Sequence, residues 1–223
     1  LGLNGLLKDE FAQDPQGLET VDHIRRSTEH LLLVVNDILD FSQLQAGKLV
    51  LREEEFALKE TITQVMTRYT DKARTKHIEL HFDAAPIHNM WVKGDKQRLT
   101  QVLNNLLDNA LRYGKPQARE QAQVTVRLSS LDDRVELTVM DNGAGLTQEE
   151  CQQLLVRGNQ GVTGQALRQG AGFGLSIVTR YAQLMGVQFW LQNTPDHPGL
   201  EAHLVFEKHS PAAAKKTLNI EPV

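Results

Sequence analysis

Over the first part of the chain, hydrophobic residues recur at intervals of three and four, which predicts helices. Leu1–Ala12 is a short segment of this kind, and the turn-like Asp14–Gly17 ends it. A longer helical pattern covers Leu18–Ala46, with Gly47 as its expected C-cap. Its apolar stripe is wide, as in helices that pack into a bundle. We therefore predict a helical hairpin at the start of the chain, with a first helix much shorter than the second.

After Lys48 the pattern changes to short alternating segments, which predict strands, separated by amphipathic helices. The predicted strands are Leu49–Leu51, Glu55–Leu58, Ile78–Phe82, Trp91–Val92, Val124–Leu128, Val135–Met140, Gln188–Leu191 and Ala202–Phe206. The predicted helices are Lys59–Thr75, Gly94–Gly114, Thr147–Leu155 and Leu175–Met185, and Val156–Gly172 is predicted to be a mobile loop. This order predicts an α+β chain. We divide it into the hairpin at 1–47, an α/β sandwich with a mixed sheet at 48–207, and a linker or tail at 208–223.

Composition and charge limit the classes of partner and site. The chain has 24 basic and 28 acidic residues, for a net charge of −4, so no nucleic-acid partner is predicted. The single cysteine, Cys151, excludes an internal disulfide framework, and we interpret it as a helix residue rather than a nucleophile. No apolar run reaches the roughly 20 residues of a membrane span. Because the chain begins at Leu1 rather than Met, we expect it to be a fragment of a longer protein.

The predicted helix Gly94–Gly114 has an unusual polar face. One arc of its helical wheel is apolar and consists of Leu99, Val102, Leu103, Leu106, Leu107, Ala110 and Tyr113. The opposite arc consists of Gln101, Asn105, Asp108, Asn109 and Arg112. Asparagine forms helices less well than the Glu and Lys residues of an ordinary solvated face. Two asparagines one turn apart therefore suggest a set of carbonyl ligands, although a tolerated polar face explains this helix equally well when it is considered alone.

Two glycine-rich stretches follow this helix. Asp141–Gly145 (DNGAG) comes at the end of a predicted strand, where the carboxylate can accept a hydrogen bond from an exocyclic amine and the glycines admit a flat ring. A hairpin turn is the alternative interpretation of that stretch. Gly170–Gly174 (GAGFG) directly precedes the predicted helix at Leu175, and glycines at such a place expose N–H groups that can hold phosphate. A flexible hinge is compatible with the same residues.

Taken in order, these stretches resemble the catalytic ATP-binding domain of sensor histidine kinases, which belongs to a superfamily shared with gyrase, Hsp90-type chaperones and MutL. Asn105–Ala110 is similar to the N box, Asp141–Gly145 to the first glycine box and Gly170–Gly174 to the second. Upstream, the segment His30–Lys48 is similar to the second helix of the dimerisation and phosphoacceptor hairpin. The resemblance covers nearly the whole chain and implies a sandwich of the Bergerat type.

The resemblance implies that the asparagine helix holds the phosphates of ATP and an Mg²⁺ ion. Asn109 would coordinate Mg²⁺, and Asn105 would support the triphosphate from one turn earlier. Arg112 would contact phosphate, while Tyr113 would lie beside the nucleotide. Mg²⁺ suits such a site because it accepts few protein oxygens together with water and phosphate.

The resemblance also assigns roles to the two glycine-rich stretches. Asp141 would bind the adenine amine, and Gly143 and Gly145 would shape the base pocket. The glycines of the second stretch would act as hinges for a lid, Val156–Gly172, that closes over the phosphates: Gly170, Gly172 and Gly174.

One position distinguishes a kinase from a hydrolase. ATP-hydrolysing relatives place a Glu one turn before the metal-binding Asn, and this chain has Asn105, which cannot act as a base. We therefore predict the transmitter core of a two-component sensor histidine kinase, which transfers the γ-phosphoryl group of ATP to a histidine. None of the eight histidines has the sequence context of the family's phosphoacceptor. We expect that acceptor upstream of Leu1, so this fragment alone should not phosphorylate itself.

Two departures from the family pattern keep alternatives open. Leu154–Gly158 replaces the Phe-x-Pro-Phe box of the lid, and Phe173 replaces a usual Leu. One alternative is therefore a catalytically weak, kinase-like regulator that heterodimerises with another sensor kinase. A second is an ATP hydrolase, which Asn105 disfavours. The resemblance further implies a homodimer through the helical hairpin, a response regulator or receiver domain as partner, and a cytoplasmic location in a bacterial sensor protein anchored in the inner membrane.

Overall fold

The chain divides into two compact units, Leu1–Leu49 and Val50–Val223. The computed structural model describes residues 14, 16–17, 19–21, 23–24, 27–28, 35, 50–84, 90–114, 121–147, 149–151, 173–194 and 198–209. In the first unit, the described residues from 16 to 35 are helical, so the second predicted helix is present but already includes Gln16 and Gly17, which were predicted to belong to a turn. The predicted helix Leu1–Ala12 and the whole of the predicted lid lie outside the described residues. None of the helices in the described ranges is long and apolar enough to cross a membrane.

A five-stranded mixed sheet forms the base of the second unit. Its strands are β2 (Ile78–Ala84), β4 (Ala122–Leu131), β5 (Arg134–Asp141), β6 (Gln188–Asn193) and β7 (Leu200–Glu207). They lie in the order β2-β4-β5-β7-β6; β2 and β4 are parallel, and the other pairs are antiparallel. A separate antiparallel pair joins β1 (Glu54–Ala57) to β3 (Trp91–Gly94). The predicted α+β class and mixed sheet are therefore confirmed.

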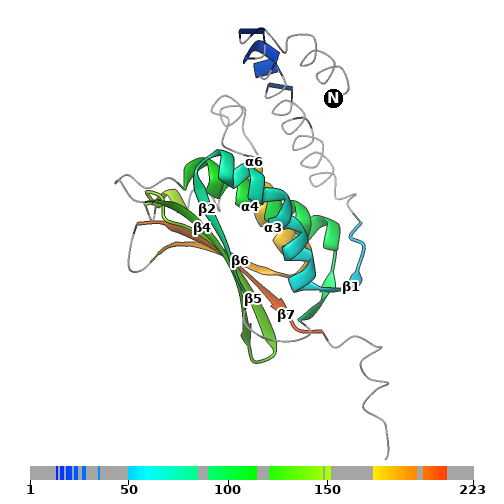
Figure 1. The fold of residues 1–223 in the computed structure, drawn as a ribbon. Helices are drawn as coiled ribbons and strands as arrows, with labels where there is room; N and C mark the ends of the chain where they lie inside the picture. The colour runs from blue at the N-terminus through cyan, green and yellow to red at the C-terminus, as the bar shows by residue number, and fades with distance from the viewer. Residues whose placement is uncertain are drawn as a thin grey trace, which may run out of the picture. The chain divides into compact units, whose positions relative to one another are not determined.

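Three helices cover one face of the five-stranded sheet: α3 (Leu58–Thr75), α4 (Lys96–Tyr113) and α6 (Phe173–Leu184) (Figure 1). The helix α4, which carries the asparagines, contacts α3, α6 and β5. It begins after Asp95, whose Oδ1 accepts the N–H of Arg98 at 3.0 Å as an N-cap. In this position between the other two helices, the polar face of α4 is partly buried, apart from the exposed Arg112.

Alternating side chains of the central strands build the core beneath these helices. The residues of β4 and β5 that face the helices are at most 4% exposed, and they are Val124, Val126, Leu128, Val135, Leu137 and Val139. Because side chains alternate along a strand, Asp141 lies on the same face as Val139, two residues before it. The sheet thus directs one carboxylate into the helix-covered side.

The apolar arc predicted for α4 is confirmed except at its end. Its buried residues are Leu99, Val102, Leu103, Leu106, Leu107, Ala110 and Leu111. Tyr113 was predicted to belong to this arc, but it is 53% exposed, whereas Leu111 is fully buried. The physical reason lies in α3, whose C-terminal end reaches this part of α4: Lys76 Nζ donates to the Leu111 carbonyl oxygen at 3.1 Å. The buried stripe therefore shifts towards Leu111 where α4 ends.

The prediction of a strand at Leu49–Leu51 is wrong for Val50 and Leu51, the two of its residues that the structure describes. Val50 and Leu51 are not in a strand, and Val50 is 85% exposed. A short apolar run forms a strand only where another strand can pair with it, and the ladder with β3 begins at Glu54. The backbone before that ladder is held differently, because the Arg52 N–H donates to Asp95 Oδ2 at 2.9 Å.

The chain leaves β7 beside the β1–β3 pair. The Lys208 N–H donates to the Asp133 carbonyl oxygen at 2.8 Å, and the His209 N–H donates to that of Trp91 at 2.8 Å. His209 Nε2 also lies 2.7 Å from Glu55 Oε1. The first two residues of the predicted tail are therefore bound to the folded unit, and residues 210–223 lie outside the described part.

A buried polar cluster surrounds His203, whose side chain lies on the sheet face opposite the helices. His203 Nδ1 lies 2.9 Å from Glu136 Oε1, and Nε2 lies 3.1 Å from Glu201 Oε2. The Trp190 ring stacks on the imidazole with centroids 4.7 Å apart. Since both ring nitrogens are engaged and the side chain is buried, His203 serves the fold of the sheet.

Candidate functional site

Asn105 and Asn109 lie one turn apart on a partly buried face of α4. The side-chain Nδ2 of Asn105 is buried and has no hydrogen-bond partner among the described residues. A buried amide group without a partner is costly, so such a group in a native fold indicates a place where a ligand or water supplies the acceptor. This face of α4 therefore has the character of a binding surface.

Other members of the predicted polar arc have partners within the fold. Asp108 Oδ1 lies 2.5 Å from Lys72 Nζ on α3. Gln101 Oε1 accepts from Arg98 Nη1 at 3.0 Å. Asp108 thus joins α4 to α3, and Gln101 pairs within α4, which sets both apart from the asparagine pair.

Arg112 and Tyr113 lie exposed in the last turn of α4. The Arg112 guanidinium lies over the Tyr113 ring, 5.3 Å from its centroid. Their exposure makes them accessible to a ligand bound at this end of α4, and their predicted contacts with phosphate and nucleotide stay predictions.

The helix α6 starts at Phe173, two residues before the start predicted from the sequence. Gly174 therefore belongs to the first helical turn and not to the loop that precedes it. A Cβ atom at Gly174 would lie 3.6 Å from Asn109 Nδ2 and 3.8 Å from Asn105 Oδ1. The first turn of α6 thus faces the asparagine pair. The other two glycines of this stretch, Gly170 and Gly172, lie outside the described residues.

Asp141 is the last residue of β5, and its carboxylate is largely buried. Its Oδ1 accepts the Gly143 N–H at 2.9 Å, and the carboxylate also accepts the N–H of Leu200. Burial raises the pKa of Asp141, and the two backbone hydrogen bonds oppose that rise without cancelling it. A carboxylate has about four lone-pair sites, so it can still accept a hydrogen bond from a ligand amine.

Close backbone contacts surround Asp141. A Cβ atom at Gly143 would lie 2.8 Å from Gly114 Cα and 2.9 Å from Asp141 Oδ1. A Cβ atom at Gly114 would lie 2.6 Å from Asp141 Cβ, and one at Gly199 would collide with the Asp141 carbonyl oxygen. The positions of Gly114 and Gly199 beside this carboxylate were not predicted from the sequence. The available signal was weak, because a glycine at the end of a helix or before a strand usually indicates a cap or a turn.

Two asparagines fix the loop that follows Asp141. Asn142 Oδ1 accepts the Gln123 N–H at 2.7 Å, which ties the loop to the start of β4. Asn193 Oδ1 accepts the Leu146 N–H at 2.9 Å from the end of β6. Between them Gly145 has a φ of +70°, a conformation that favours glycine. The loop is therefore a braced structure with its shape set from both sides.

The hairpin interpretation of Asp141–Gly145 is wrong. The β4–β5 hairpin turns at Asp132 and Asp133, at the other end of β5. After the loop, residues 149–151 are helical, and a capping box forms the start of this helix. The Glu150 N–H donates to Thr147 Oγ1 at 3.2 Å, and the Thr147 N–H donates to Glu150 Oε2 at 2.7 Å. Thr147 thus caps the start of the helix predicted at Thr147–Leu155.

These elements meet along the C-terminal half of α4. Asn105 and Asn109 face the first turn of α6, and Gly114 at the end of α4 contacts Asp141. The donor set suits a magnesium nucleotide: an amide hydrogen for a phosphate oxygen, an amide oxygen for the metal, and a carboxylate for a base amine. In the described ranges, no group of three His, Cys, Asp or Glu residues could hold a metal ion. Mg²⁺ bound to nucleotides commonly uses one or two protein oxygens together with phosphate.

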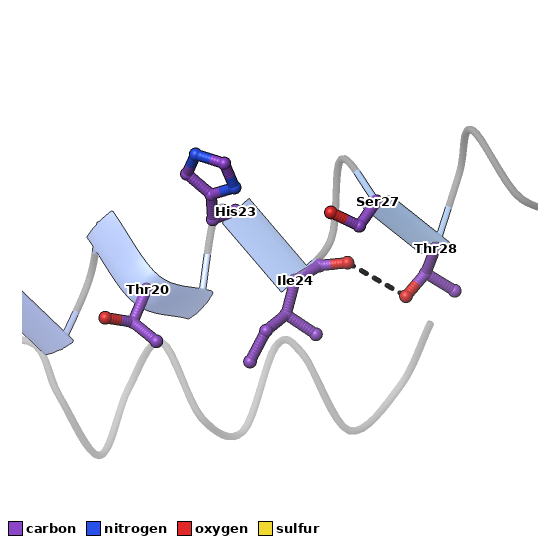
Figure 2. A pocket seen from close by; sticks show the side chains of 5 residues that line it. All are labelled: Thr20, His23, Ile24, Ser27 and Thr28. Atoms are coloured by element: carbon purple, nitrogen blue, oxygen red, sulfur yellow. Dashed lines mark hydrogen bonds between the residues drawn. The ribbon is translucent and has the colours of Figure 1, made fainter. Parts of the chain in front are cut away.

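Figure 2 shows five side chains of mixed polar and apolar character along the helix of the first unit. Thr20, His23, Ile24, Ser27 and Thr28 line a shallow hollow along it. Ile24 is 50% exposed, and the Thr28 hydroxyl donates to the Ile24 carbonyl oxygen at 2.8 Å. An exposed isoleucine on a bundle-type helix suits a surface that another helix covers.

Comparisons with known proteins agree with this geometry. Residues 94–210 match the family described as histidine kinase-, DNA gyrase B-, and HSP90-like ATPase. The circadian input-output histidine kinase CikA of Synechococcus elongatus is 35% identical over 179 residues, which are 79% of this chain and 23% of CikA. This chain thus spans less than a quarter of that relative.

Solved histidine kinase structures have the same fold. The structure of full-length ShkA in complex with AMPPNP matches 95% of this chain and 43% of that chain, with 26% identity and a TM-score of 0.70. Histidine kinase ThkA in complex with response regulator protein TrrA matches 93% of this chain and 57% of that chain, with 22% identity and a TM-score of 0.64. The chain belongs to the histidine kinase-, DNA gyrase B-, and HSP90-like ATPase family, as the ATP-binding catalytic domain of a histidine kinase with its preceding helical region.

Proposed function

We propose that the second unit binds ATP with Mg²⁺ and transfers the γ-phosphoryl group to a histidine outside these 223 residues, for relay to a response regulator. The observation that carries this proposal is the buried Asn105 Nδ2, which has no partner among the described residues and lies where α6 begins. Family membership supports ATP as the ligand. The similar kinase ShkA was solved with AMPPNP, a nucleotide with a triphosphate chain.

The described residues suggest how the nucleotide would be held. Asp141 would accept a hydrogen bond from the adenine amine, with Gly143 and Gly145 leaving space beside it. At the other end, Asn105 Nδ2 would donate to a phosphate oxygen, and Asn109 would offer its side-chain oxygen to Mg²⁺. The ion would neutralise phosphate charge.

The residues at the edges of the site would complete it. Arg112 and Tyr113 are accessible at the end of α4, and they would contact phosphate and nucleotide. Gly174 would let α6 come close to the phosphates, while Gly170 and Gly172 would give the lid its freedom.

Asn105 favours transfer over hydrolysis. An amide cannot take a proton from water at neutral pH, so this position lacks the general base that a Glu would provide. In transfer, a histidine nitrogen attacks the γ-phosphorus, and the bond to the bridging oxygen breaks with its electron pair going to ADP. No base at position 105 is needed for that displacement, because neutral imidazole brings its own lone pair.

The partners follow from the same proposal. The exposed Ile24 and Val35 of the first unit would be covered in a homodimer of helical hairpins, and another sensor kinase could form a heterodimer in the same way. A response regulator or a receiver domain would take the phosphoryl group from the histidine. Because ATP is the donor, we place the chain in the cytoplasm, as part of a sensor protein that is anchored in the inner membrane of a bacterium.

Phosphoryl transfer from [γ-³²P]ATP tests the proposal. The chain is extended at its N-terminus through a candidate acceptor histidine and compared with the double variant Asn109→Ala/Asp141→Ala. Asp83→Ala is the matched control. Asp83 is an exposed residue of β2 that pairs with Arg127 of β4, away from α4. We expect a base-stable, acid-labile label in the parent and the control, and none in the double variant.

Three outcomes would contradict the proposal. Equal labelling in the double variant would refute the site. Steady ATP turnover without label would indicate a hydrolase. ATP binding with neither label nor turnover would indicate a regulator that acts by binding.

A further inference from the structure

A line of hydrogen bonds runs through the first turn of α4, from the segment that precedes β1 to the helix α6. Asp95 Oδ2 accepts the backbone N–H of Arg52 at 2.9 Å, and Asp95 Oδ1 accepts the backbone N–H of Arg98 at 3.0 Å. The Arg98 side chain continues the line, because its Nη1 donates to the Tyr181 hydroxyl at 2.9 Å. These bonds connect Arg52 to α6 without a gap.

The environment of this line makes its bonds strong. Asp95 is 5% exposed and Tyr181 is fully buried, so water competes little for these groups. Both Asp95 and Arg98 carry charge, and hydrogen bonds with one charged partner are shorter and stronger than neutral ones. The Arg98 guanidinium also lies over the Tyr181 ring, 5.1 Å from its centroid. Tyr181 is therefore held to α4 by two kinds of contact.

The helix α6 extends this line to the asparagine pair. Gly174 and Tyr181 are seven residues apart, which is about two helical turns, so they lie on the same face of α6. That face meets Asn105 and Asn109 at Gly174 and meets Arg98 at Tyr181. A two-turn helix segment is stiff, so a displacement of its first turn also moves Tyr181.

We propose that Asp95, Arg98 and Tyr181 couple nucleotide binding at the asparagine pair to the order of the backbone at Arg52. The coupling rests on the proposed function, since the nucleotide is the ligand that acts at Asn105 and Asn109. A nucleotide that fixes the first turn of α6 also fixes Tyr181 against Arg98, and through Asp95 it fixes Arg52. Arg52 is the third residue of the second unit, so the nucleotide state is transmitted to the backbone next to the point in the sequence where the two units join.

Linkage makes this coupling reciprocal. Whatever holds Arg52 in place raises the affinity for nucleotide by the same factor by which nucleotide raises the order of Arg52. A signal that pulls on the segment before β1 would therefore change ATP affinity without any contact with ATP. This is a regulatory property of the fold that the binding residues alone do not provide.

Two conservative variants each remove one hydrogen bond of this line. Asp95→Asn leaves one side-chain oxygen to cap α4, and Asn caps helices about as well as Asp, but its NH₂ group cannot accept the Arg52 N–H. Tyr181→Phe removes only the hydroxyl that accepts from Arg98. Tyr69→Phe is the matched control, because Tyr69 is also a buried tyrosine whose hydroxyl donates to α4, at the Asn104 carbonyl oxygen, away from the line.

Hydrogen exchange at the Arg52 amide, with and without AMPPNP and Mg²⁺, tests the proposal in the 223-residue chain. We expect the nucleotide to slow this exchange about fivefold or more in the parent chain and in Tyr69→Phe, the lower end of typical coupling. In Tyr181→Phe the slowing should be largely lost although AMPPNP still binds. In Asp95→Asn the amide should exchange faster even without nucleotide, and AMPPNP should have little effect on it.

Two results would overturn the coupling alone: AMPPNP binding to the parent without slower exchange at Arg52, or undiminished slowing in Tyr181→Phe. Absence of AMPPNP binding to the parent, measured in the same samples by calorimetry, would overturn the proposed function and the coupling with it. The two failures are therefore distinguishable.

Discussion

Replacement of Asp141 by asparagine should change the base selectivity of the site. The substitution preserves the shape of the side chain and one oxygen, which can still accept the Gly143 N–H as Oδ1 does now at 2.9 Å. It removes one acceptor and the negative charge, and it adds an NH₂ donor. Adenine presents an amine at its 6-position and guanine presents a carbonyl oxygen there, so the two bases should respond in opposite directions.

The magnitude follows from the loss of the hydrogen bond between the Asp141 carboxylate and the adenine amine. A hydrogen bond to a charged group contributes about 1.5–3 kcal/mol, and about 1.4 kcal/mol corresponds to a factor of ten in affinity. Asp141→Asn should therefore bind ATP about 10- to 150-fold more weakly. GTP binding should improve, because a donor replaces an acceptor opposite the guanine oxygen, and the ratio of the two affinities should change by more than either affinity.

The thermal stability of Asp141→Asn shows whether a loss of ATP affinity comes from the changed base contact or from damage to the fold. Burial raises the pKa of Asp141 above its ordinary 3.8, so the folded protein binds this proton more tightly than the unfolded chain does. The stability that the protonated group contributes is present below pH 3.8 and is lost as the pH rises through the folded pKa. At pH 7 the ionised side chain is therefore unfavourable, and Asp141→Asn should unfold at the same temperature as the parent or at a higher one.

Isothermal titration of ATP and GTP with Mg²⁺, together with thermal unfolding at pH 7, measures these effects. Asp83→Asn is the matched control, because it neutralises an exposed carboxylate that pairs with Arg127 at 3.1 Å. The parent should also lose ATP affinity as the pH falls through the raised pKa of Asp141, and the asparagine variant should not. An unchanged ATP affinity, or equal losses for ATP and GTP, would refute the role of Asp141 in reading the base.

Two further substitutions test other parts of the account. Gly143→Ala places a Cβ atom 2.8 Å from Gly114 Cα and 2.9 Å from Asp141 Oδ1. It should therefore destabilise the fold by about 1–3 kcal/mol, measured by urea unfolding, and weaken ATP binding. The control is Gly94→Ala, where a Cβ atom meets nothing within 4 Å, and it should have neither effect. Equal effects at the two glycines would contradict the close packing around Asp141. Asn105→Glu provides a base one turn before Asn109 and should raise the rate of steady-state ATP hydrolysis, measured by phosphate release. The control Asn105→Gln provides no base and should not raise that rate. The same rate in both variants would contradict the role proposed for position 105.

The sequence predicted where the candidate residues lie in their helix and strand, because that placement depends on local patterns. The spacing of Asn105 and Asn109 defines one face of a helix, and Asp141 follows an alternating strand whose buried face is clear from the sequence. Both features survive in the structure because helix and strand periodicity alone determine them.

The remaining features depend on tertiary packing. Leu111 replaces Tyr113 in the core because α3 ends against that part of α4, which no pattern within α4 reveals. The contacts of Gly114 and Gly199 with Asp141 bring together residues that are far apart in the sequence. The start of α6 was predicted two residues too late, at Leu175 instead of Phe173. A glycine such as Gly174 is typical of a loop, and its place opposite the Asn109 side chain depends on the tertiary fold.

The side-chain amide of Asn105 is the group on which a bound phosphate should have the most direct effect. Its NH₂ resonances in a ¹⁵N-correlated NMR spectrum can be assigned by their disappearance in Asn105→Ala. Because Nδ2 is buried without a partner among the described residues, we expect these resonances to shift downfield when AMPPNP and Mg²⁺ saturate the chain, as a phosphate oxygen becomes the acceptor. Resonances that stay unchanged at saturating nucleotide would contradict the claim that this asparagine helix holds the phosphates of ATP.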